Sequence, residues 1–352
     1  MNFDDFVSGK RGWLGEDGPE SEIVFSSRVR VARNLADHLF PSRATAADKK
    51  EITMKVVAAV KSIPRFRRCS VLKIEELEEI DKQLLVERYL ISRELSTKKA
   101  GSGVVIDSKG IVTIMINEED HIRMQALMSG FRLGECWEII SEIDDRLECR
   151  LGFAFSPQNG YLTACPTNVG TGIRVSAMLH LPGLILSKQI DQVLQAVSKL
   201  HLAVRGLYGE GSEAFGNFFQ VSNQVTLGKS EEEIIALLEK VVRQVIGTER
   251  NARKSFLKTG ADVLYDQVGR AYGILSNAHM ITSKEAIDLL STLRMGIDLK
   301  IVRKLERQAV NELFILTQPA HLQKANGKEL DAVSRDIERG NLLRSKLTKG
   351  EE

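Results

Sequence analysis

The sequence has no apolar run that approaches the roughly 20 residues needed for a membrane-spanning helix. Its first residues, 1–5, are acidic and precede no apolar stretch, unlike a secretory signal peptide. The formal net charge is only +2, which argues against a nucleic-acid-binding protein with a basic surface. We therefore expect a cytoplasmic protein that binds neither membrane nor nucleic acid.

Cysteine is scarce as well, with four residues in a chain of 352. They are Cys69, Cys136, Cys149 and Cys165, which form no CxxC pair and show no zinc spacing. We expect free thiols in a reducing compartment and no metal ion held by the protein's own side chains.

The glycine-rich motifs that cradle phosphate are missing too. The chain contains neither a GxxxxGK motif followed by Ser or Thr nor a GxGxxG between a strand and a helix. Arginine is the remaining means of binding phosphate, because a guanidinium group pairs with two oxygens and stays charged.

The composition that is present, 43% hydrophobic and 27% charged, is typical of a soluble globular protein. Three parts are expected along the chain. Residues 1–20 are polar and glycine-rich and predict a poorly fixed arm. Residues 21–254 are expected to form a first domain, and residues 255–352 an all-helical second domain.

The pattern in the first half indicates an α+β fold, an antiparallel sheet flanked by helices. β-branched residues at 104–106 and 111–116 flank a turn and predict a hairpin, and residues 153–163 predict a second one. Apolar spacing between them predicts a helix over 124–150.

The pattern changes to helical after Gly228. Ser230 with Glu233, and Thr282 with Glu285, are capping boxes that open amphipathic runs. Apolar residues from Leu299 to Leu316 repeat in steps of three and four and predict a further helix.

Paired charges suggest chemistry in the first half. Arg28 and Arg30 lie two apart on an expected strand and therefore share one face, although strand arginines are often merely solvated. The acidic run 117–120 could be a helix N-terminus. Alternatively, Glu119 and Glu210 could grip a guanidinium group and accept its proton.

A cysteine in a glycine-containing loop is the third feature. Cys165 begins the segment 165–172, where Gly170 and Gly172 would let the backbone approach a ligand. Nearby arginines would favour a thiolate that orients a guanidinium nitrogen, although most lone cysteines only fill space. Residues 207–211 indicate a mobile loop that carries Glu210 over the site and excludes water.

Taken together, SSRVR at 26–30, NEEDHIR at 117–123 and CPTNVGTG at 165–172 make the chain similar to the guanidino (phosphagen) kinases, and most of all to the bacterial protein arginine kinases of that family. The resemblance runs from Ser21 to about Gly228 for the catalytic domain and continues through Arg339. It implies the guanidino-kinase catalytic fold and in-line transfer from ATP, with Mg²⁺ held mainly by the nucleotide phosphates.

The resemblance also implies residue roles. The expected catalytic residues are Glu119, Glu210 and Cys165. The expected ATP-binding residues are Ser27, Arg28, Arg30, His121, Arg123, Arg174, Arg205 and Gly206. For His121, the residues alone favour a structural hydrogen bond over contact with nucleotide.

Protein is the expected substrate. Metabolite kinases of the family carry a small helical domain ahead of SSRxR, for which the sequence before Ser26 leaves no room, so we expect an open site. The family's helical domain implies a homodimer and an allosteric phosphoarginine site at Arg335, Asp336 and Arg339. Gly340 stands where the family motif has alanine, which should loosen that helix, and Glu338 adds a negative charge beside the proposed anion site.

The family implies partners as well: a zinc-binding activator protein, the heat-shock transcriptional repressor and a Clp unfoldase-protease that degrades arginine-phosphorylated proteins. Two alternatives stay open. One is a guanidino kinase of free arginine or another small guanidine, and the other is a non-catalytic adaptor that binds phosphoarginine proteins.

Overall fold

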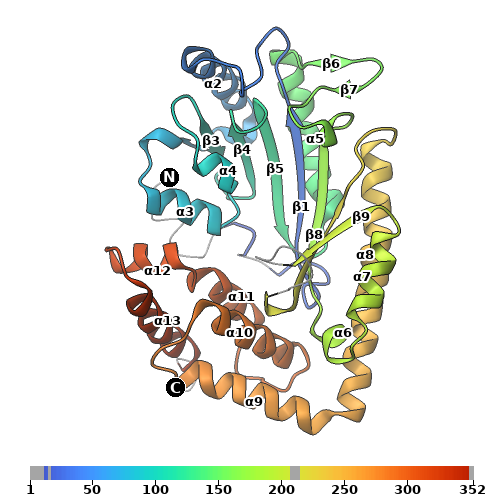
Figure 1. Ribbon diagram of the computed structural model, residues 1–352, viewed down its shortest axis with the longest axis vertical. Coiled ribbons are helices and arrows are strands. Elements are labelled where there is room, and N and C mark those ends of the chain that lie inside the picture. The colour runs from blue at the N-terminus through green and yellow to red at the C-terminus, as the bar shows by residue number, and fades with distance from the viewer. Residues whose placement is uncertain (1–11, 15–16, 207–214, 349–352) are drawn as a thin grey trace.

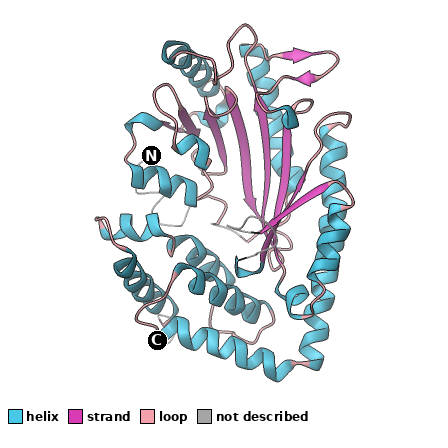
Figure 2. Cartoon of the chain, in the orientation of Figure 1, coloured by secondary structure: helices cyan, strands magenta, loops and turns pink. Residues whose placement is uncertain are grey.

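The computed structural model describes residues 12–14, 17–206 and 215–348. An eight-stranded antiparallel sheet forms its centre, in the order β2-β3-β4-β5-β1-β8-β10-β9 (Figure 2). The strands are β1 (Val24–Arg33), β2 (Ser70–Lys73), β3 (Gly103–Ile106), β4 (Val112–Ile116), β5 (Ile122–Ser129), β8 (Ile173–His180), β9 (Leu202–Gly206) and β10 (Phe218–Asn223). A separate two-stranded hairpin consists of β6 (Phe155–Ser156) and β7 (Gly160–Tyr161).

Helices flank the sheet and fill the C-terminal third of the chain. They are α2 (Ala46–Lys61), α3 (Glu79–Glu87), α4 (Arg93–Ser96), α5 (Leu133–Leu151), α6 (Pro182–Leu186), α7 (Ile190–Ser198), α8 (Glu231–Thr259), α9 (Ala261–Asn277), α10 (Ser283–Asp298), α11 (Arg307–Leu316), α12 (Pro319–Asn326) and α13 (Ala332–Leu347). The α+β class and both hairpins are confirmed. No helix among the described residues is long and apolar enough to cross a membrane.

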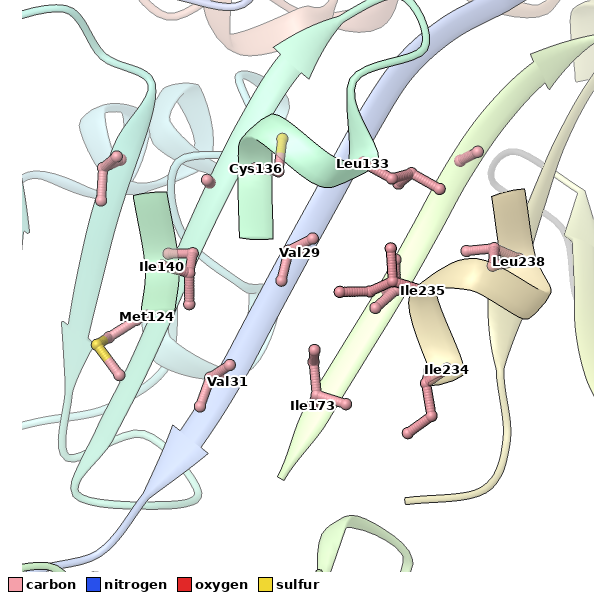
Figure 3. Close-up of a cluster of buried hydrophobic side chains, with 14 of the residues drawn as sticks. Val29, Val31, Met124, Leu133, Cys136, Ile140, Ile173, Ile234, Ile235 and Leu238 are labelled. Atoms are coloured by element: carbon pink, nitrogen blue, oxygen red, sulfur yellow. The ribbon is translucent and has the colours of Figure 1, made fainter. Parts of the chain in front are cut away.

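One face of the sheet is apolar and packs against α5 and α8. Val29 and Val31 of β1 contribute to it, and Ile140 of α5 and Leu238 of α8 belong to the same cluster of buried side chains (Figure 3). Because side chains alternate along a strand, Arg28 and Arg30, which each directly precede one of these valines, project from the opposite face. Core packing on one face therefore fixes which residues the other face displays.

The C-terminal helices α9 to α13 group at one end of the sheet, joined to it by the long α8 (Figure 1). The expected capping box at Ser230 and Glu233 opens α8. Buried Arg294 of α10 donates to the main-chain oxygens of Ser21 and Glu22 and thereby ties this group of helices to the start of β1. The domain boundary expected between residues 254 and 255 falls inside α8.

Three sequence expectations were wrong in part. Residues 124–129 belong to β5, so the expected helix begins only at Leu133. Residues 299–306 lie outside the helices, and α11 begins at Arg307. In the expected arm, Trp13 is buried: its ring packs 5.2 Å from that of Phe25 and its Nε1 donates to the Arg88 oxygen.

Candidate functional site

Strand register brings the separate arginines together on the polar face of the sheet. Arg30 of β1 lies directly opposite Arg174 of β8, and its neighbour Ala32 lies opposite Arg123 of β5. Arg205 of β9 lies across from Gln220 of β10. Residues paired in this way on antiparallel strands project to the same side.

These arginines line one cleft of about 420 Å³ together with the proposed carboxylate and thiol. The lining residues are Arg28, Arg30, Val31, Ala32, Glu119, Arg123, Cys165, Thr167, Asn168, Gly172, Arg174, Arg205 and Gln220. Five arginines, Glu119 and Cys165 were expected here from sequence, and the structure brings all seven together. Gly206, which ends β9, does not line the cleft.

The cleft is strongly electropositive. Burial lowers the pKa of Arg28 to about 10, with a further contribution from nearby Arg123. Burial and the charges of Arg28, Arg123 and Arg174 hold the pKa of Arg30 well below its usual range. Arg30 also keeps a buried Nε without a hydrogen-bond partner among the described residues. An anionic ligand would relieve both the repulsion and the missing bond.

Glu119 is the half-buried carboxylate of the cleft. Its Oε2 accepts a hydrogen bond from Nη2 of Arg123 at 2.8 Å. Burial raises the pKa of the Glu119 carboxyl, and the charge of Arg123 opposes that rise. Nη1 of Arg123 lies 2.5 Å from Oε2 of the neighbouring Glu118, so Arg123 is held between two carboxylates. A carboxyl with a raised pKa is a stronger base than an ordinary glutamate.

The loop that carries Cys165 is held by a residue that the sequence analysis did not single out. Buried Asp120 accepts from Nδ2 of Asn34 at 2.7 Å and from the main-chain nitrogen of Ala164 at 2.6 Å. Sγ of Cys165 lies 3.0 Å from Oγ1 of Thr167. The acidic run 117–120 was the available signal, but its spacing does not show which carboxylate faces the cleft.

The glycines of this loop serve the scaffold as well as the cleft. Gly170 and Gly172 both have positive φ, at 110° and 64°. A Cβ at Gly170 would lie 2.3 Å from the Thr226 oxygen, and one at Gly172 would lie 2.6 Å from the Ala32 oxygen. We expected these glycines to let the backbone approach a ligand. In the structure they let it approach the protein's own main chain, although Gly172 also lines the cleft.

Two expected nucleotide contacts are buried away from the cleft. His121 is fully buried, accepts from the Leu35 nitrogen at Nδ1 and donates to the Leu39 oxygen from Nε2. Burial also lowers its pKa. Ser27 is fully buried as well: its hydroxyl donates to the Gly130 oxygen and accepts from the Arg132 nitrogen. In this structure both are structural residues.

Glu210 and the rest of the expected loop 207–211 lie outside the described residues. The role of Glu210 as the second carboxylate that binds the substrate guanidinium therefore stays a prediction.

The proposed phosphoarginine site lies on α13, away from the cleft. Arg335 and Asp336 are half-buried, whereas Arg339 is buried and donates to the oxygens of Thr317 and Ile281 and to Oδ1 of Asp336. A ligand that uses Arg339 would have to replace these bonds.

The expectation that Gly340 loosens the helix was wrong. Helix α13 runs through this position without interruption. A Cβ on Gly340 would lie 2.6 Å from the His279 oxygen and 2.9 Å from the Ala278 oxygen. The glycine thus permits a close contact between α13 and the segment before α10.

Comparisons with known proteins agree with this geometry. Residues 51–252 match the family described as ATP:guanido phosphotransferase, C-terminal catalytic domain, and residues 261–352 match the Protein-arginine kinase McsB C-terminal domain. The chain is 47% identical to the protein-arginine kinase of Halothermothrix orenii, with 95% of this chain and 96% of the relative covered. It is 46% identical to that of Geobacillus thermodenitrificans, with 99% and 96% covered.

A solved lombricine kinase shares the fold at a TM-score of 0.60 and 21% identity, with 72% of this chain and 71% of that chain covered. The fold is therefore that of a guanidino kinase. The family match and the full-length similarity show that the chain belongs to the protein-arginine kinase family of ATP:guanido phosphotransferases.

Proposed function

We propose that the protein transfers the γ-phosphoryl group of ATP to the guanidinium group of arginine side chains in other proteins. The observation that carries this proposal is the single cleft in which five arginines face a carboxylate and a thiol. A polyphosphate and a guanidinium are the two ligands that such a set of charges fits.

The arginines act on the nucleotide. Their guanidinium groups bind the phosphate oxygens and spread the charge that develops on the transferred group. Because the cleft is built before the substrate arrives, little reorganisation is needed during the reaction. Magnesium enters as part of the nucleotide substrate, where it neutralises phosphate charge. The cleft's arginines, with one carboxylate and one thiol, fit a metal held by phosphates rather than by a protein cage.

Glu119 acts on the acceptor. It binds the substrate guanidinium through paired N–H groups, and its raised pKa suits it to take the proton. A guanidinium nitrogen forms the new bond to phosphorus, the bond from phosphorus to the bridging oxygen of ADP breaks, and the displaced proton passes to the carboxylate. We propose that Cys165 orients the same guanidinium and that Glu210 is the second gripping carboxylate.

The biological setting is proposed from the family. We infer that phosphoarginine marks proteins for a Clp unfoldase-protease, that the heat-shock repressor is one substrate, and that a zinc-binding activator protein stimulates the enzyme. A cytoplasmic stress-response role follows from these partners. A homodimer formed through the C-terminal helices is part of the proposal. It is supported by exposed apolar side chains such as Tyr265 of α9 and Val333 of α13.

Allosteric binding of phosphoarginine at Arg335, Asp336 and Arg339 is a separate part of the proposal. A phosphoarginine peptide should bind the full chain whose catalytic cleft is filled by a non-hydrolysable ATP analogue, and Arg335→Ala should abolish that binding. Binding that survives the substitution would contradict this part.

The test of the proposed function is a transfer assay with magnesium-ATP and an unfolded arginine-containing protein. The product is located by mass spectrometry at neutral pH, because a phosphorus–nitrogen bond is labile in acid. Phosphoarginine in the polypeptide, absent with Glu119→Gln, is the expected result. Phosphate only on free arginine in a parallel reaction would show a metabolite kinase, and phosphate on neither, with the activator present, would show an adaptor.

A further inference from the structure

Gln125 lies on β5 two residues after Arg123, and its side chain is 1% exposed. Its Oε1 accepts a 2.9 Å hydrogen bond from Nε of Arg28 and a second bond from Nη2 of the same guanidinium. Its Nε2 donates to the main-chain oxygen of Tyr89 at 2.7 Å. One amide thus joins an arginine of the cleft to the main chain just after α3.

The chemistry of an amide suits this position. Arg28 is close to Arg123 and Arg174, which repel it, and burial removes the water that would otherwise solvate it. A neutral oxygen satisfies two of its N–H groups and leaves its charge intact. A carboxylate there would cancel the charge that phosphate needs, and an aliphatic side chain would leave buried donors unpaired.

The anchor for this amide is itself fixed. Glu87, at the end of α3, accepts hydrogen bonds from the main-chain nitrogens of Ala320 and His321 at the start of α12. The Arg88 oxygen accepts from Nε1 of Trp13. The segment that holds Gln125 is therefore bound to the C-terminal helices and cannot shift freely.

We propose that Gln125 is a positioning residue for nucleotide binding, which holds Arg28 in the orientation that meets a phosphate oxygen. With Nε and one N–H of Nη2 engaged, the remaining N–H groups of Arg28 are left for the ligand. The inference rests on the proposed function, in which Arg28 binds the phosphates of ATP.

The experiment measures the dissociation constants of ATP and ADP by calorimetry for Gln125→Leu, Arg28→Ala and the double variant. Gln125→Leu should weaken binding by about tenfold, which corresponds to the loss of hydrogen bonds to a charged group. In the Arg28→Ala background the same substitution should have little further effect, since Gln125 acts through Arg28. Additive losses, or unchanged affinity in Gln125→Leu, would overturn the inference.

A matched control is available on α12. The amide of buried Gln323 also bridges main-chain groups, from the Leu330 nitrogen to the Pro319 oxygen, but it lies away from the cleft. Gln323→Leu should lower the melting temperature without changing nucleotide affinity. An equal loss of affinity in both variants would mean that Gln125 has only a structural role.

If Gln125→Leu does not fold, Gln125→Glu carries the test, because it preserves the size of the side chain and pairs with Arg28 while cancelling its charge. Its nucleotide affinity should fall, and unchanged affinity would overturn the inference. The affinity measurements can be interpreted separately from the test of the proposed function. A wild-type protein that binds ATP but phosphorylates no protein arginine would refute the function, while the double-variant cycle would still decide the role of Gln125.

Discussion

Oε2 of Glu119 lies 2.8 Å from Nη2 of Arg123, so the carboxylate proposed to accept the substrate's proton is paired with an arginine proposed to bind phosphate. The side chain proposed to bind the acceptor guanidinium and a side chain proposed to bind the nucleotide are therefore in direct contact. A substrate guanidinium that enters the cleft would donate hydrogen bonds to Glu119 in place of Arg123. Arg123 would then donate to the nucleotide phosphates instead.

Glu119→Gln should lower kcat by about 10²- to 10⁴-fold, the usual contribution of a general base, and leave ATP binding largely intact. The wild-type rate should fall on the acid side as Glu119 becomes protonated. Because burial raises the pKa of this carboxyl, the fall should occur at a higher pH than the value of about 4.3 for an ordinary glutamate. A pH profile of kcat/KM checks this, and a substitution without effect on kcat would remove Glu119 from the mechanism.

Cys165→Ser should cut the rate of transfer strongly while nucleotide affinity stays near the wild-type value. The reason is that Cys165 is placed to orient the acceptor guanidinium rather than the phosphates. Single-turnover kinetics and direct ATP binding separate the two effects. Lost ATP affinity in this variant would mean that the thiol contacts the nucleotide instead.

Glu210→Ala should abolish transfer, because one carboxylate alone would leave the guanidinium without its second point of attachment. The position lies outside the described residues, so this variant supplies information that the geometry does not. Retained activity would refute the two-carboxylate grip, whatever the result at Glu119.

Gly340→Ala should destabilise the protein by about 1–3 kcal/mol, since the added methyl group must displace the main chain at His279. Chemical denaturation measures the free energy of unfolding. Gly269 of α9 is the matched control, because nothing lies within 4 Å of a Cβ built there. Gly269→Ala should be neutral or stabilising by up to about 1 kcal/mol, as expected for alanine in a helix. Equal effects at the two positions would contradict the close contact.

His180 should make the protein less stable at acid pH. It is fully buried, its Nε2 donates to Oγ of Ser291, and its Nδ1 accepts from Nη1 of Arg294. Burial and the charge of Arg294 hold its pKa well below the usual range. The folded state therefore binds this proton more weakly than the unfolded chain, and stability present above about pH 6.5 is lost as the pH falls below it.

Below pH 6.5, this one histidine should lower the free energy of unfolding by up to about 1.4 kcal/mol for each pH unit. His180→Gln retains an acceptor and a donor but does not titrate, so it should flatten the dependence. Denaturation curves measured from pH 7 to pH 5 test this. An equally steep slope in the variant would assign the acid sensitivity to other groups.

The arginines of the cleft could be expected from sequence because the resemblance to guanidino kinases assigns them phosphate-binding roles, and alternation along a strand places Arg28 and Arg30 on one face. The helix expected over 124–150 was wrong at its start. Met124, Leu127 and Phe131 fit a helical spacing even though residues 124–129 form a strand of the sheet. Hydrophobic spacing over so short a segment does not separate the two structures.

Contacts between distant segments were beyond the reach of sequence. The amide of Gln125 acquires its importance from Arg28, 97 residues away in the chain. Trp13 gave no usable pattern, yet it packs on Phe25. Gly340 was interpreted from helix propensity alone, whereas the close main chain of His279 explains the glycine.

The central claim is that arginine within a polypeptide is the acceptor. The most direct measurement is a competition in one reaction, in which free arginine and an unfolded arginine-containing protein share the enzyme and magnesium-ATP, and kcat/KM is obtained for each. The account predicts that phosphoarginine accumulates in the polypeptide with a much larger kcat/KM than in the free amino acid. An equal or larger kcat/KM for free arginine would contradict it.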